Sequence, residues 1–182
     1  RLALEQRAYW LHMKAHLALF EDPGFCAQAV ETAKNLSQYP DAPQGDDLHP
    51  LAVDAVLFEG GGFAQFVDRR GYLLPDDERN LAQRWLSVQR AVYELVFVDP
   101  GVSVTLRDVK SGETTRVVAD DQGPELKVGG LYCARIVPAG DTMQIFSPMV
   151  PVPPKQLDHL KDVLSGQPSP VELIDALKHR RD

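Results

Sequence analysis

The change in hydrophobic spacing at about residue 92 constrains the fold of this chain more than any other feature. From 92 to 146 short β-type segments alternate with turn signals, while the residues before and after this run have helical spacing. Val102, Val104 and Leu106 alternate with polar residues, which is the period of a half-buried strand. The turns DPG, KSGE and PAGD separate neighbouring segments. The sequence therefore predicts an α+β protein in which a small β module lies between two helical parts.

The amino-terminal part of the chain has apolar residues at three- and four-residue steps, which is the spacing of a helix face. We predict helices over about 2–20, 25–37, 50–59, 63–71 and 76–89. The helix over 50–59 is apolar around most of its circumference and is therefore expected at the centre of the protein. The segment 39–47 is rich in proline, glycine and aspartate, which is typical of a flexible loop.

The β module is predicted to contain five short antiparallel strands that form a small barrel or a strongly twisted sheet. Their simple succession favours an SH3-like meander. Two helices follow, over about 155–164 and 170–177, with Ser169 placed to cap the second. The expected domains are a helical domain over 1–87, the β module over 88–150, and carboxy-terminal helices over 151–182 that pack on both.

Composition excludes several classes of function. The chain has 182 residues and a formal net charge of −7, which disfavours a general binder of nucleic acids or membrane surfaces and leaves only a local basic patch open. Cys26 and Cys133 have neither CxxC spacing nor a neighbouring histidine, so we expect no zinc site within this chain and a reducing, intracellular setting. A disulfide between them stays open. No apolar run approaches the roughly 18 residues of a membrane span, and we expect a cytoplasmic protein without membrane partners.

Three motifs carry some chemical signal. His12 and His16 have the spacing of two metal ligands on one helix, but Met13 occupies the position of the catalytic glutamate of zinc hydrolases. The glycines 60–62 precede a helix, yet no lysine or hydroxyl residue follows as in a phosphate loop. The acids 76–78 open a helix, where they suit the macrodipole. We favour a polar helix face for the two histidines, a sharp corner between helices for the three glycines, and a helix start for the three acids.

No nucleophile, dinucleotide-binding or catalytic cysteine motif is present, so we lean towards a protein that is not an enzyme. The remaining candidate is a modest basic stripe on the β module, formed by Arg107, Lys110, Arg116 and Arg135.

Small β-barrels bind single-stranded nucleic acid with such cations beside aromatic rings. The aromatic rings here are those of Tyr93, Tyr132 and Phe146. The alternative, which we favour, is that the rings fill the module and the cations pair with Asp108 and Glu113 across a hairpin.

Three long segments carry a resemblance to a known family. They are LHPLAVDAVLFEGGGFAQFVDRRGYLLPDDERNLAQRWL, VYELVFVDPGVSVTLRDVKSGET and LYCARIVPAGDTMQIF. These segments resemble the long region of bacterial, especially actinobacterial, proteins classed as SEC-C motif-containing. The resemblance implies a zinc-associated protein without an assigned reaction. The defining CPCGSG-type zinc motif is absent from this chain, so no zinc ligand can be assigned here and any zinc is expected upstream of Arg1 in the full-length protein.

The sequence therefore predicts a non-enzymatic interaction or adaptor protein, with a protein as its first expected partner. Two alternatives stay open. The β module could bind nucleic acid, or the protein could be an enzyme with a cleft between its helical and β parts. A deep pocket with several buried, charge-perturbed side chains would favour the enzyme, whereas an exposed apolar or basic patch would favour the adaptor. The oligomeric state is not indicated.

Overall fold

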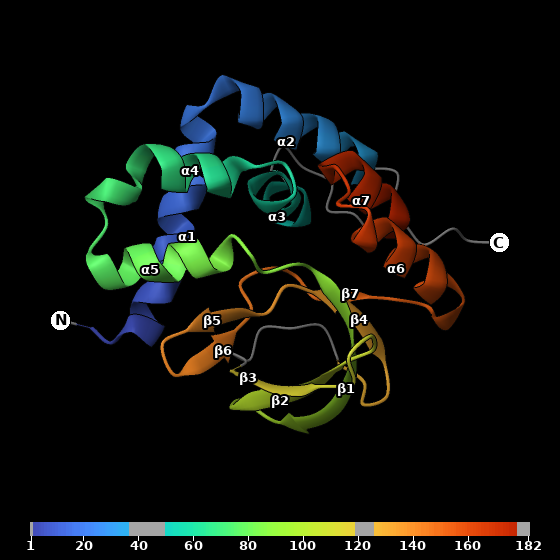
Figure 1. Cartoon of the computed structure of the whole chain (residues 1–182). Coiled ribbons are helices and arrows are strands. Elements are labelled where there is room, and N and C mark those ends of the chain that lie inside the picture. The colour runs from blue at the N-terminus through green and yellow to red at the C-terminus, as the bar shows by residue number, and fades with distance from the viewer. Residues whose placement is uncertain (1, 37–49, 119–125, 178–182) are drawn as a thin grey trace.

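The computed structural model describes residues 2–36, 50–118 and 126–177, and Figure 1 shows its helices gathered on one side of a strongly curled sheet. The helices are α1 (Leu4–Glu21), α2 (Pro23–Leu36), α3 (Pro50–Phe58), α4 (Gly62–Arg70), α5 (Asp76–Trp85), α6 (Leu157–Ser165) and α7 (Pro170–Leu177), with short 3-10 turns at Gly71–Leu73 and Pro154–Gln156. The strands are β1 (Ala91–Asp99), β2 (Ser103–Asp108), β3 (Thr114–Val118), β4 (Leu131–Ala134), β5 (Val137–Ala139), β6 (Thr142–Gln144) and β7 (Val150–Pro151). The predicted α+β class is confirmed. The predicted loop 39–47 lies outside the described residues.

Local chemistry separates the helices near the predicted positions, although α5 ends at Trp85 and not at Gln89, and α2 begins at Pro23. Between α1 and α2, the Asp22 carboxylate accepts the backbone N–H groups of Gly24 at 2.9 Å and Phe25 at 3.3 Å. Before α7, the Ser169 hydroxyl oxygen accepts the Glu172 N–H at 3.2 Å, which confirms the predicted cap.

The turn between α3 and α4 depends on its glycines. A Cβ at Gly60 would lie 2.5 Å from the Val56 carbonyl oxygen, and Gly61 has a φ of 83°. Any side chain at position 60 would therefore clash with the backbone. At position 61 the left-handed backbone conformation favours glycine over other residues. The glycines therefore form the predicted corner between two helices.

The sheet differs in detail from the predicted five-stranded antiparallel meander, and an SH3-like order is not confirmed. Its strand order is β5-β6-β3-β2-β1-β4-β7. Most neighbours are antiparallel, but β3 and β6 are parallel, with Val118 opposite Gln144. The predicted strand 131–137 divides at Arg135 and Ile136, and the chain then carries β5 to the opposite end of the strand order. This division occurs where Arg135 forms bonds to helical-part residues instead of continuing a ladder.

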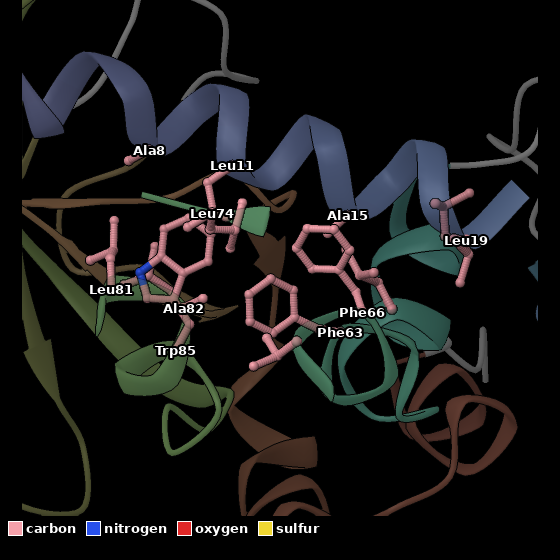
Figure 2. Close-up of a cluster of buried hydrophobic side chains, with 14 of the residues drawn as sticks. Ala8, Leu11, Ala15, Leu19, Phe63, Phe66, Leu74, Leu81, Ala82 and Trp85 are labelled. Atoms are coloured by element: carbon pink, nitrogen blue, oxygen red, sulfur yellow. The ribbon is translucent and has the colours of Figure 1, made fainter. Parts of the chain in front are cut away.

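Three buried clusters hold the elements together. The first joins one face of α1 to α4 and α5, and Figure 2 shows these side chains converging on Phe63 and Trp85. It also contains Val137 and Ala139 of β5, and the Trp85 indole N–H donates to the Pro138 carbonyl oxygen at 2.7 Å. The helical part and the sheet therefore share a core.

The second cluster connects α3, α6 and α7 to the back of the sheet through Val92 and Cys133, and the third lies inside the curl of the sheet. Every residue of α3 from Leu51 to Leu57 is buried, so the predicted central helix is confirmed. Among the described residues, no helix has the length and apolar character that crossing a membrane would need.

Candidate functional site

Four charged side chains meet at the junction of the helical part and the sheet. Asp54 belongs to α3, Glu59 follows α3, Arg90 immediately precedes β1, and Arg135 follows β4. Arg90 forms an ion pair with Asp54, and its Nε donates to Glu59 Oε1 at 3.0 Å. Arg135 Nη2 donates to the same oxygen at 2.6 Å, while its Nη1 donates to the Val88 carbonyl oxygen at 2.8 Å. We call Asp54, Glu59, Arg90 and Arg135 the junction network.

The junction network is removed from water. The side chains of Arg90 and Asp54 are only 1% and 2% exposed, that of Arg135 is 5% exposed, and that of Glu59 is 10% exposed. An isolated charge at such a depth would be very costly, but two positive and two negative groups in hydrogen-bond contact compensate one another. Ser147 completes the arrangement, because its hydroxyl donates to Asp54 Oδ1 at 2.6 Å.

The two arginines are not compensated equally. Burial lowers the pKa of Arg90, but the charges of Asp54 and Glu59 outweigh this effect and the pKa is raised overall. The pKa of Arg135 is lowered instead, because burial and the positive charge of Arg90 together outweigh the attraction of Glu59. The guanidinium of Arg135 also lies 4.1 Å from the centroid of the Phe58 ring, which is a cation–π contact. Arg135 is therefore the less compensated cation of the junction network.

A cavity of about 370 Å³ adjoins this network. Glu59, Arg90 and Arg135 form part of its wall, and the aromatic rings of Phe58 and Trp85 form another part. The other lining residues are Phe63, Ala64, Leu86, Val88, Gln89, Leu164, Gln167 and Pro168, the last two from the connector between α6 and α7. We call this space the junction cavity. The cavity lies between helical residues and the segments that flank β1 and β4, and the enzyme alternative stays a prediction.

One backbone irregularity lies at the junction cavity. Gln167 has a φ of 53° and is the one non-glycine residue with positive φ in the described part of the chain. A side chain in this left-handed region stores strain that other contacts must offset, and such strain gathers at functional sites.

The two predicted metal-ligand candidates lie beside the network without forming a metal site. The rings of His12 and His16 are 4.4 Å apart, and the Nε2 atoms of both are buried without a described hydrogen-bond partner. Burial, and then the neighbouring His16, lower the pKa of His12 to about 4. The pKa of His16 is lowered mainly by burial. Among the described residues, no group of three or more histidine, cysteine or acidic side chains could hold a metal ion.

The predicted basic stripe is only partly assembled. Arg107 on β2 and Arg116 on β3 share the outer face of the sheet, and Lys110 is exposed in the turn between these strands. Arg135 belongs to the buried junction network and not to that face. Tyr132 is buried in the core of the sheet and Tyr93 packs against that core, as the alternative interpretation expected, whereas Phe146 packs against the helical core instead of filling the β module.

The pairing partners of the surface cations differ from the predicted Asp108 and Glu113. Arg107 donates to Glu94 at 2.7 Å, and Arg116 lies 4.0 Å from Asp99. Asp108 instead accepts the N–H groups of the following turn, beginning with Lys110 at 2.7 Å. The carboxylates that balance the stripe therefore come from β1, which only the register of the sheet reveals.

Helix α1 presents a second candidate site. Leu11, Ala15 and Leu19 lie on its buried face. Its opposite face carries Trp10, 56% exposed, and Leu17, 62% exposed. Tyr9 and Phe20 are also exposed on that side, Met13 lies between them, and Leu2 precedes the helix. We call Tyr9, Trp10, Met13, Leu17 and Phe20 the outer face of α1.

Sequence reasoning missed the junction network and the outer face of α1. Asp54 offered a signal for the first, because it is the one charged residue in an otherwise apolar helix and needs a buried partner there. The apolar residues at 10, 13, 17 and 20 offered a signal for the second, since they repeat at steps of three and four on the side of the helix away from the predicted core face. The acids Asp77 and Glu78 also do more than open α5, because both form ion pairs with Arg7 of α1.

Comparison of the chain with protein-family models, with curated proteins and with solved structures finds no match. The resemblance to SEC-C motif-containing proteins therefore stays a prediction.

Proposed function

We propose that this chain is an interaction protein that binds a protein partner through the outer face of α1. The observation that carries the proposal is that α1 is apolar on two opposite sides while only one of them is buried. A helix that is apolar all round normally lies inside a core, so an exposed second apolar face favours a partner that covers it.

The geometry of the outer face suits a helix or a flat apolar surface. In α1 the positions 10, 13, 17 and 20 follow one another along a single stripe. The rings of Tyr9 and Trp10 meet edge to face at 5.3 Å, which gives the stripe a broad aromatic end. Aromatic residues of this kind are the usual anchors of protein interfaces.

A photo-crosslinking experiment tests the proposal. A benzophenone amino acid replaces Trp10 in the full-length protein, expressed in its native host, and crosslinked products are resolved by mass. We expect a discrete product that disappears in Leu17→Lys and persists in Val128→Lys, because Val128 is equally exposed at 65% but lies in the β module. A product with twice the mass of the protein would make a second copy the partner. Absence of a discrete product, or one insensitive to Leu17→Lys, contradicts the proposal.

A second candidate function is single-strand binding by the outer face of the sheet, and the position of Phe97 favours it. Phe97 is 59% exposed and pairs with Thr105, which in turn pairs with Arg116 on β3. An exposed ring therefore lies on the same face as Arg107 and Arg116, which is how small β modules combine stacking with phosphate contacts. Glu94 and Asp99 reduce the local positive charge.

Affinity for a labelled single strand tests this second candidate. The candidate function predicts that the double variant Arg107→Glu with Arg116→Glu no longer binds the strand. Phe97→Ala should bind the strand more weakly but with the same dependence on salt concentration, because it removes stacking and no charge. Unchanged affinity in the double variant excludes it.

A further inference from the structure

We propose that the junction cavity binds a small monocarboxylate whose body is apolar and contains a ring. Its volume of about 370 Å³ falls within the usual range of small-molecule sites, about 300–1,000 Å³. The site is independent of the outer face of α1.

Among the described residues of the cavity wall, the buried side-chain atoms without a hydrogen-bond partner are donors. The oxygens of Glu59 already accept from Arg90 and Arg135. In contrast, Arg90 Nη1 and Arg135 Nε are buried without a described hydrogen-bond partner. A buried guanidinium N–H without an acceptor destabilises the folded protein. A ligand oxygen that reaches this N–H after a small shift of the wall forms a charge-assisted hydrogen bond and removes that cost. The complementary ligand group is an oxygen acceptor.

The charge of the wall favours a single negative charge on that acceptor. Arg90 and Arg135 bring two positive charges to the lining and Glu59 brings one negative charge. Asp54, the fourth member of the junction network, is not part of the lining. Asp54 is nevertheless the ion-pair partner of Arg90, so the junction network as a whole is neutral and Arg135 is its weakly compensated cation. A monocarboxylate can pair with Arg135, and a planar carboxylate fits the fork of a guanidinium.

The remaining wall selects an apolar body. Phe58 and Phe63 stack at a centroid distance of 5.2 Å, and Trp85 lies 5.7 Å from Phe63. The Trp85 N–H already donates to Pro138, so the indole presents its ring and not a polar group. Phe63 and Trp85 are themselves covered, so the apolar surface that a ligand can bury comes from the partly exposed Phe58, Leu86 and Leu164. These side chains favour a flat apolar body by burial and stacking. The connector with the strained Gln167 lines the same space.

The test compares an acid with its neutral isostere on the full chain. Binding of 2-naphthoate and of 2-naphthamide is measured by calorimetry and by the shift in melting temperature. We expect naphthoate to bind at least about tenfold more tightly, which corresponds to about 1.4 kcal/mol, and to raise the melting temperature. Equal affinity for the acid and the amide, or no binding of naphthoate at millimolar concentration, overturns the proposal.

Two variants locate the site. Ala64→Trp adds an indole at an exposed residue of the cavity lining and should abolish naphthoate binding. Its matched control is Ala27→Trp, at an exposed position of α2 outside the lining, which should bind as the wild type does. An Arg135→Gln variant whose circular dichroism matches that of the wild type should bind naphthoate no more tightly than naphthamide. Naphthoate binding that survives Ala64→Trp would overturn the assignment to this cavity.

Discussion

Mild acidification should destabilise this protein, and His12 is the reason. His12 is 5% exposed, its Nε2 has no described hydrogen-bond partner, and its ring stacks on Phe146 with centroids 5.2 Å apart. Protonation would place a positive charge beside the neighbouring His16 without a hydrogen bond to receive it. The nearby Asp54 favours the protonated form, but burial dominates and the pKa of His12 falls to about 4.

The size of the effect follows from the difference between the folded and unfolded pKa. A histidine whose pKa falls from 6.5 to about 4 on folding binds its proton more readily in the unfolded chain. Its contribution is therefore complete above about pH 7, declines as the pH falls through the unfolded value, and is lost entirely below about pH 4. The total loss is about 3 kcal/mol, of which about 2 kcal/mol has occurred by pH 5. His16, whose pKa is also lowered, acts in the same direction.

Urea denaturation at several pH values between about 7.5 and 5, followed by tryptophan fluorescence, measures this loss. Burial raises the pKa of Asp54, but the charges of Arg90 and Arg135 outweigh it and hold the pKa below its usual value, so this carboxylate stays ionised throughout the range. We expect His12→Gln to reduce the decline in the free energy of unfolding by about 2 kcal/mol. The exposed His159 provides the matched control, and His159→Gln should parallel the wild type. A His12→Gln variant with the same pH dependence as the wild type would show that the decline has another origin.

Three further predictions concern buried groups. Asp54→Asn should lower the free energy of unfolding by about 3–5 kcal/mol. Asp54→Leu combined with Arg90→Met should recover most of that loss, because the remaining pair of Arg135 and Glu59 is balanced. A double variant that is no more stable to denaturant than Asp54→Asn contradicts this. The Cys133 thiol, whose pKa burial raises to about 12, should resist alkylation at pH 8 until urea unfolds the chain, and mass spectrometry of the native protein would reveal any earlier labelling. Gly60→Ala should lower the free energy of unfolding by about 1–3 kcal/mol, because the added Cβ meets a backbone carbonyl oxygen. Gly166→Ala is the control: its added Cβ has no contact closer than 3.5 Å, and its free energy of unfolding should stay within about 0.5 kcal/mol of the wild type in the same denaturation assay.

The sequence predicted features that depend on neighbouring residues. The break at Pro23, the corner at the glycines 60–62 and the Ser169 cap each follow from the stereochemistry of a few adjacent residues, and the structure confirms them. The burial of α3 followed from its composition, because a helix without a polar face has no side to expose to water.

Strand order was less accessible to sequence reasoning. The strand predicted over 131–137 has continuous β character, and nothing in its local pattern marks Arg135 as the point of division. The division arises because Arg135 finds Glu59, 76 residues away, and the Val88 carbonyl oxygen. A pairing at that distance is fixed by the shared core and not by the local period of two.

The α+β class, the helix-to-sheet transition near residue 92 and the local caps and corners can all be read from the amino-acid order, because each depends on side-chain period or on backbone chemistry within a few residues. Which charges meet depends on the folded chain. Asp54 and Arg90 are 36 residues apart, yet they form one buried pair beside the junction cavity. Folding also selects the covered face of α1, since both faces have helical spacing and only packing against α4 and α5 distinguishes them. The sequence signals at Asp54 and along α1 do not identify the partners or the exposed face, because these are set by residues distant in sequence that only folding brings together.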